Sequence, residues 1–152
     1  MAIYEYTLKG RKLNDSASPE LDRPEDVADY LLANCYDPDE MWREKAFAVY
    51  LNSENKILGH FLISAGGTNS TDFDVKLVAK PALELMASAV IISHNHPSGN
   101  PLPGKADFDS TQKVKKALAL FDVKMLDHII IGDGKAYSFD MEKTFTLETT
   151  QP

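Results

Sequence analysis

The chain has 152 residues, of which 43% are hydrophobic, and it carries a formal net charge of -7. This length suits one domain, and this apolar fraction excludes a disordered chain. The single cysteine, Cys35, excludes an internal disulfide and any zinc site built from several thiolates, and it fits a reducing compartment.

Charge and segment composition also limit the location and the partners of the protein. The acidic balance disfavours nucleic acid as a partner, because phosphate contacts need clustered Lys and Arg. The first residues lack the basic and apolar regions of a signal peptide, and no apolar run is long enough to span a membrane. We therefore expect a cytoplasmic protein whose oligomeric state the sequence leaves open.

The first half of the chain predicts one helix and two strands after a polar start. Residues 1–23 form a mixed N-terminal segment, with positions for a short strand at Ile3, Tyr4 and Tyr6. A helix should begin at Pro24, with acids in its first turn, where they suit the helix dipole. Its residues expected to face the core are Val27, Tyr30 and Leu31. Residues 44–51 and 56–64 predict strands joined by a hairpin turn.

A second helix is expected over residues 74–86, where Pro81 should kink or split it. Its residues predicted to point inward are Val75, Val78, Leu83 and Met86. Residues 89–93 form a short, wholly apolar run, which is typical of a strand buried on both faces. This strand leads directly into the next histidine.

The last part of the chain predicts a long helix and two further strands. The helix is expected over residues 105–121, with one stripe made of Phe108, Thr111, Val114, Leu118 and Phe121. Strands should follow at 123–131 and 136–139, and the tail after Lys143 shows no pattern. The alternation of strands and helices predicts an α/β domain with a mixed sheet flanked by helices.

One segment carries the clearest chemical signal. Residues 93–108 read SHNHPSGNPLPGKADF, with His94 and His96 two positions apart after the apolar strand. In an extended segment such residues point the same way, and the proline-rich loop can return Asp107 to them from the start of the next helix. Two imidazoles and a carboxylate suit Zn²⁺ with one position left for water, and Fe²⁺ accepts the same set.

A less specific interpretation is that both histidines are ordinary loop residues and that Asp107 only caps a helix. For the His-x-His pattern alone, the two interpretations carry about equal weight, because short motifs match often by chance. The buried strand before the pattern and the acid at a helix start after it favour the metal site.

The segment HNHPSGNPLPGKAD resembles the signature of the JAB/MPN-plus (JAMM) metalloproteases, and more closely their bacterial RadC-like branch. The segments EKAFAVYLN and LDHIIIGDG with KAYSF are similar to further parts of that branch. The resemblance covers roughly residues 24–142. It implies an α/β JAB/MPN-like fold, related to that of cytidine deaminases, over residues 24–143, with residues 144–152 as a C-terminal tail.

The resemblance also implies roles for individual residues. His94, His96 and Asp107 match the zinc ligands of the family, with a metal-bound water completing the site. Glu44 matches the glutamate that binds this water and acts as general acid and base. The chain departs from the family at Gly104, where the JAMM pattern has a serine thought to stabilise the oxyanion. Ser98 belongs to the HPSG segment and is expected to structure the loop.

These features predict a zinc-dependent hydrolase of JAMM type, a metallopeptidase or isopeptidase that acts on a peptide or protein substrate. Gly104 motivates an alternative, in which the chain is a non-catalytic metal-binding interaction module. A further alternative is a DNA-repair-associated role, which rests only on the label that the RadC-like branch carries. The sequence identifies neither the substrate nor the metal.

Overall fold

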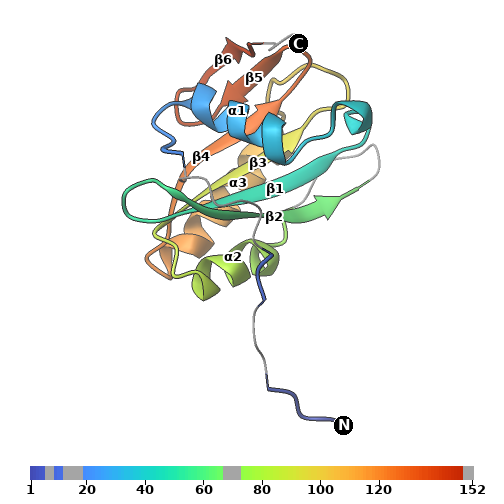
Figure 1. The fold of residues 1–152 in the computed structure, drawn as a ribbon. Helices are drawn as coiled ribbons and strands as arrows, with labels where there is room; N and C mark the ends of the chain where they lie inside the picture. Colours follow the sequence, from blue (N-terminus) through green and yellow to red (C-terminus); the bar gives the residue numbers. More distant parts are fainter. Residues whose placement is uncertain (6–8, 12–18, 67–72, 149–152) are drawn as a thin grey trace.

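The protein is described by a computed structural model over residues 1–5, 9–11, 19–66 and 73–148. In this described part, six strands form one mixed sheet with the order β2-β1-β3-β4-β5-β6. Figure 1 shows the sheet running through the middle of the molecule, with helices before and behind it. The α/β class expected from the sequence is confirmed.

The elements follow the predicted order. The strands are β1 (Lys45–Leu51), β2 (Ile57–Ala65), β3 (Ala89–Asn95), β4 (Lys124–Ile131), β5 (Lys135–Ser138) and β6 (Lys143–Thr146). The helices are α1 (Pro24–Asn34), the short 3-10 helix η1 (Pro38–Glu40), α2 (Val75–Glu84) and α3 (Lys105–Ala119). Strands β3 and β4 pair in parallel, and every other neighbouring pair is antiparallel.

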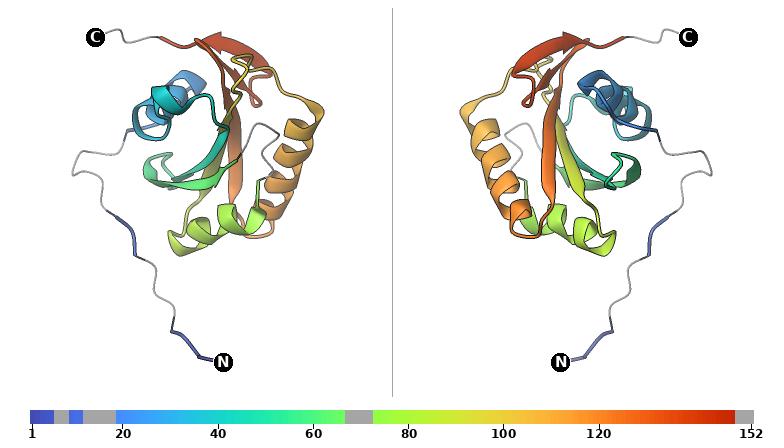
Figure 2. Two further views of the ribbon diagram at one scale, coloured as in Figure 1. Left: turned by 90° about the vertical axis from the view of Figure 1, so that its right-hand side faces the viewer. Right: turned by 90° about the vertical axis from the view of Figure 1, so that its left-hand side faces the viewer.

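Helices cover both faces of the sheet. Figure 2 shows α1 on one side and α2 and α3 on the other. Successive side chains along β3 point to opposite faces of the sheet. Val90 and Ile92 pack with α2 and α3, whereas Ala89 and Ile91 pack with α1. Because both faces are covered, all seven residues of β3 are buried.

The predicted inward faces of two helices were partly wrong. In α2 the buried stripe consists of Val78, Ala79 and Ala82, so Leu83, one residue further around the helix, is exposed. Met86 lies beyond the end of α2 with a positive φ and is also exposed. Pro81 does not split α2, which runs through it as one element.

In α3 the residues Thr111, Val114 and Leu118 are buried as predicted. Phe108, in the first turns of the helix, is half-exposed and stacks edge-on against Phe139 instead of entering the core. Phe121 lies past the last helical residue and is half-exposed as well. The stripe therefore extends less far along the chain than the periodicity predicted.

Both ends of the described chain also differ from expectation. Ile3 and Tyr4 are exposed and belong to no strand, and Tyr6 lies outside the described residues. Strand β6 pairs with β5 within the stretch that showed no pattern. Its sequence, KTFT, has one large apolar residue, which is typical of a short edge strand and gives little periodic signal.

Candidate metal centre

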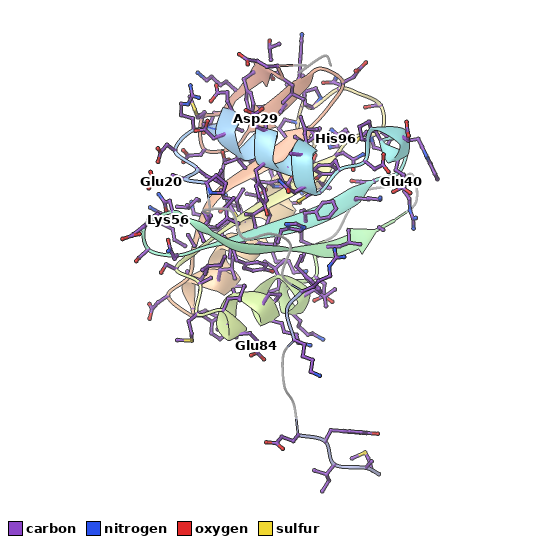
Figure 3. All side chains as sticks on the ribbon, in the orientation of Figure 1. Glu20, Asp29, Glu40, Lys56, Glu84 and His96 are labelled. Atoms are coloured by element: carbon purple, nitrogen blue, oxygen red, sulfur yellow. The ribbon has the colours of Figure 1, made fainter. Side chains whose placement is uncertain are left out.

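Strand β3 delivers the two histidines to one end of the sheet. His94 is the sixth residue of β3, inside the strand and not after it as the sequence predicted, and His96 follows the last strand residue. The His96 amide still donates to the carbonyl of Ile131 on β4 over 2.9 Å, which keeps the chain extended. Figure 3 shows His96 at the opposite end of the sheet from Lys56 in the β1–β2 hairpin.

The loop between β3 and α3 is held against the turn after β4. The Asp133 amide donates to the carbonyl of Gly99 over 2.8 Å. A Cβ atom at Gly132 would lie only 2.4 Å from that carbonyl oxygen and 2.8 Å from the Pro101 ring, so this close approach requires glycine. The loop is thereby fixed as it returns the chain towards the histidines.

Helix α3 begins at the end of this loop and presents Asp107 from its first turn. One carboxylate oxygen of Asp107, Oδ2, accepts a hydrogen bond from the Gly104 amide over 2.8 Å. This contact caps the helix and leaves the carboxylate directed at β3. The other oxygen, Oδ1, lies 3.0 Å from His94 Nε2, and Oδ2 lies 3.3 Å from His96 Nε2.

These side chains form a cluster that could hold a metal ion. The two Nε2 atoms of His94 and His96 are 3.0 Å apart. Ligand atoms about 2.0–2.1 Å from a tetrahedral Zn²⁺ stand roughly 3.3–3.4 Å from one another. The two imidazole nitrogens need to move apart by only a few tenths of an ångström to fit such an ion, and one carboxylate oxygen of Asp107 lies within 4.8 Å of both.

Each histidine presents Nε2 because its other ring nitrogen is engaged. Nδ1 of His96 lies 2.8 Å from the carbonyl oxygen of Asn100, which can only accept, so Nδ1 carries the proton. Nδ1 of His94 lies 2.7 Å from Nε2 of His128. An uncharged imidazole with its proton on Nδ1 has its lone pair on Nε2, which is the form that binds a metal.

The cluster shifts the acid–base properties of its members. Burial alone would raise the pKa of Asp107, but hydrogen bonds from His94 and His96, when these also carry a proton on Nε2, and from the Gly104 amide hold that pKa well below its usual range. The pKa of His96 is raised, mainly by its hydrogen bond to Asp107 and also by the charge of Glu44. Asp107 is therefore ionised at neutral pH, as a metal ligand must be.

Glu44 lies immediately before β1, which pairs with β3 in an antiparallel register that sets Ala46 opposite His94. Continued by two residues, this register places Glu44 across from His96. The Glu44 side chain is buried, and its carbonyl accepts from the Gly66 amide over 3.0 Å at the end of β2. The charge of Glu44 acts on His96, so its carboxylate lies near the cluster, but it is not one of the grouped donors.

The two remaining predicted residues flank the cluster. The hydroxyl of Ser98 is exposed and accepts a hydrogen bond from the Asn100 amide over 3.3 Å, within the same turn that engages His96. Gly104 is the N-cap of α3. A Cβ there would meet Asp107 Oδ2 at 3.8 Å, which is an ordinary contact, so the structure leaves space for a side chain at this position.

Sequence reasoning gave Asn95 no role and placed Thr111 only on the buried stripe of its helix. Asn95, between the two histidines, points the other way and binds the backbone that carries Glu44. Thr111 and His128 continue the hydrogen-bond chain from His94 into the core. The usable signal was polarity at buried positions, because Asn95 and His128 interrupt otherwise apolar strands.

Cys35 takes no part in this cluster. Burial raises the pKa of its thiol to about 12, so the thiolate needed for nucleophilic chemistry is scarce at neutral pH.

Among the helices that the structure describes, none combines the length and the apolar character that a membrane span requires.

A mixed sheet flanked by helices, with two histidines and an aspartate gathered at the end of its central strand, defines an α/β domain of the JAB type. The RadC-like JAB domain matches residues 21–144 of the chain. The chain therefore belongs to the RadC-like JAB domain family, which confirms the resemblance inferred from its motifs.

Curated relatives are similar to a large part of this chain. A UPF0758 protein of Carboxydothermus hydrogenoformans is 39% identical over 122 residues, 80% of this chain and 53% of that protein. UPF0758 protein YfjY of Escherichia coli is 42% identical over 97 residues, 64% of this chain and 61% of that protein. A UPF0758 protein of Flavobacterium johnsoniae is 43% identical over 106 residues, 70% of this chain and 46% of that protein. The chain spans about half the length of these relatives.

Proposed function

We propose that this domain is a zinc-dependent hydrolase of JAMM type that cleaves a peptide or isopeptide bond. The observation that carries the proposal is the convergence of the two Nε2 atoms, 3.0 Å apart, with the Asp107 carboxylate, whose oxygens lie 3.0 and 3.3 Å from them, and with the charge of Glu44 acting on His96. The side chain of His94 is only 1% exposed, but those of His96 and Asp107 are 20% and 12% exposed. The cluster is therefore buried on one side and open to a substrate on the other.

The residues divide the chemical work in a way that suits hydrolysis. Zinc held by His94, His96 and Asp107 would polarise the scissile carbonyl and lower the pKa of a water to about 7. Glu44 is the group that would accept a proton from the attacking water and pass it to the leaving amine nitrogen. Its place is set by the strand pairing of β1 with β3, which fixes it relative to His96.

Changing Glu44 to glutamine should separate metal binding from chemistry. Glutamine keeps the size of the side chain but cannot accept the proton, so we expect cleavage to fall by about 10²–10⁴-fold. Zinc content should stay at the wild-type level, because Glu44 is outside the donor cluster. Zinc content is measured by elemental analysis of the zinc-loaded protein. Cleavage by the same protein is measured by mass spectrometry of a library of peptides and lysine isopeptides.

Cleavage products that appear equally with wild type and Glu44→Gln would contradict the role of Glu44. A variant that loses zinc together with activity would instead place Glu44 among the metal ligands.

Gly104 supports a second candidate function, a non-catalytic module that retains the fold and the metal. The JAMM pattern has a serine at this position, and the loss of one oxyanion-hole donor costs about 10²–10³-fold in rate. The site geometry does not depend on that hydroxyl, because the helix cap is made by Asp107 and the Gly104 backbone. Metal binding without turnover is therefore compatible with the structure.

Changing Gly104 to serine tests this alternative. The space at the position accepts a Cβ, and serine is the better N-cap, so we expect stability to rise by a few tenths of a kcal/mol. If the missing hydroxyl limits the wild type, cleavage should increase by up to about 10²–10³-fold with zinc affinity unchanged. An active wild type that gains nothing from the change would remove the support for the non-catalytic module.

A further inference from the structure

A chain of short hydrogen bonds runs from the candidate metal centre into the core. Nδ1 of His94 lies 2.7 Å from Nε2 of His128 on β4. Nδ1 of His128 lies 2.6 Å from the hydroxyl of Thr111 on α3. That hydroxyl also lies 2.6 Å from the carbonyl oxygen of Asp107, one helical turn earlier. The chain therefore begins and ends on two of the three residues of the cluster.

The direction of each hydrogen bond follows from the donors available. The Asp107 carbonyl can only accept, so the single hydroxyl proton of Thr111 is donated to it. The Thr111 oxygen must then accept from His128, which places a proton on His128 Nδ1. If His128 carries one ring proton, its Nε2 is an acceptor, and His94 donates to it from Nδ1. In the uncharged His94, the lone pair then lies on Nε2, towards Asp107 and His96.

The surroundings of His128 favour a ring with a single proton. His128 is completely buried on the α3 side of the sheet. It stacks on Phe139, with ring centroids 4.7 Å apart, and meets Phe73 edge-on at 5.3 Å. An enclosure of aromatic rings does not stabilise a charged imidazolium as water or a carboxylate would.

We propose that Thr111 and His128 are positioning residues that hold His94 in the tautomer with Nε2 free to bind the metal. The proposal deepens the proposed function, since it concerns the same metal site. Thr111 has a double role, because its hydroxyl also ties the first turn of α3, which carries Asp107, to β4. The Thr111 hydroxyl thus helps to fix the position of Asp107 relative to His94.

The tautomer of His128 can be measured directly and needs no metal. The chain has four histidines, so ¹⁵N-histidine NMR of the full chain can resolve each imidazole. We expect the proton of His128 on Nδ1 and a bare Nε2, both in metal-free and in zinc-loaded protein. A proton on His128 Nε2 would overturn the proposal, whether or not the protein binds zinc or cleaves anything.

Changing Thr111 to valine tests the consequence for metal affinity. Valine keeps the branched shape but removes the hydroxyl, so we expect zinc affinity to fall by about 10–100-fold and the His128 signals to change. Thr111→Ser restores the hydroxyl and should restore both. Affinity is measured by competition with a chelator of known zinc affinity. Zinc affinity equal to wild type in Thr111→Val would overturn the proposal.

Tyr36→Phe is a matched control for a general loss of stability. Its hydroxyl makes a buried 2.8 Å hydrogen bond to Ser93, the residue before His94, from the α1 side of the sheet. This variant should lose stability and keep the wild-type zinc affinity and His128 tautomer. A fall in zinc affinity as large as that of Thr111→Val would overturn the specific role of the chain. Wild-type protein that binds no zinc would refute the proposed function and leave the tautomer result to decide the hydrogen-bond chain.

Discussion

Replacement of His96 by alanine should lower the zinc affinity of the protein by about 10³-fold or more. Removal of a group that only orients a ligand costs about 10–100-fold, and His96 supplies one of three donor atoms itself. His96 suits this test better than His94, because its side chain is 20% exposed and that of His94 is 1% exposed. Alanine at position 96 therefore opens no cavity in the core, and the fold should persist.

His60→Ala is the matched control for this prediction. His60 lies on β2 and is also half-buried, with its Nδ1 2.8 Å from the Tyr30 hydroxyl. Its loss removes an imidazole and a hydrogen bond of similar kind away from the cluster. Zinc content after dialysis, measured by elemental analysis, should stay stoichiometric in His60→Ala and fall in His96→Ala. Equal retention in both variants would refute the metal centre.

The cluster was predictable because its geometry is mostly local. His94 and His96 share a face by the two-residue period of extended chain, and only ten residues separate His96 from Asp107. The sequence showed a buried strand before the histidines and a helix start at the aspartate, and the structure has both. Short-range patterns of this kind determine where the three side chains point. Their grouping could therefore be predicted without knowing how distant parts of the sequence fold.

The supporting contacts were not predictable, because they join residues that only the sheet brings together. Asn95 binds backbone atoms about fifty positions earlier, and His94 meets His128 from a different strand. No periodic pattern in one segment reports on such a pair. The exposed Phe108 and the additional strand β6 were missed for a related reason, since local hydrophobic spacing does not show where a neighbouring element ends.

Glu44 was predictable in part, less than the three residues of the cluster but more than the supporting contacts. Its family match gave it a role, but its location depends on how β1 pairs with β3 and on what fixes the residues before β1. The pairing follows from the register, in which Ala46 lies opposite His94. Of the residues before β1, Glu44 still has one backbone contact, since its carbonyl accepts from the Gly66 amide over 3.0 Å, and Met41 and Arg43 are bound through a side chain. Asn95 provides that side chain.

Replacement of Asn95 by alanine should destabilise the protein by about 2–4 kcal/mol and lower cleavage more than zinc binding. The Asn95 side chain is fully buried, and it donates to the carbonyls of Met41 and Arg43 over 3.1 and 3.0 Å. Its oxygen accepts from the Lys45 amide over 2.8 Å. Each buried backbone group left without a partner costs about 1–3 kcal/mol, which partial access to water reduces here.

The Asn95→Asp variant distinguishes hydrogen bonding from packing. Aspartate has nearly the same shape and keeps the acceptor for the Lys45 amide, but it sets a carboxylate oxygen against two carbonyl oxygens. We therefore expect Asn95→Asp to destabilise at least as much as Asn95→Ala, as measured by the urea midpoint at neutral pH. If packing alone mattered, the aspartate variant would instead be close to wild type.

Asn52→Ala provides the comparison for an asparagine that binds backbone without holding the site. Its side-chain oxygen also accepts from two amides, those of Glu54 and Lys56, but in the exposed β1–β2 hairpin. Because water can replace these contacts, we expect a loss of about 1 kcal/mol or less and no change in cleavage.

Since Asn95 fixes the residues on both sides of Glu44, its loss should displace the carboxylate while the three donor atoms stay in place. Cleavage that falls only in proportion to zinc occupancy would show that Asn95 supports the fold but not the position of Glu44.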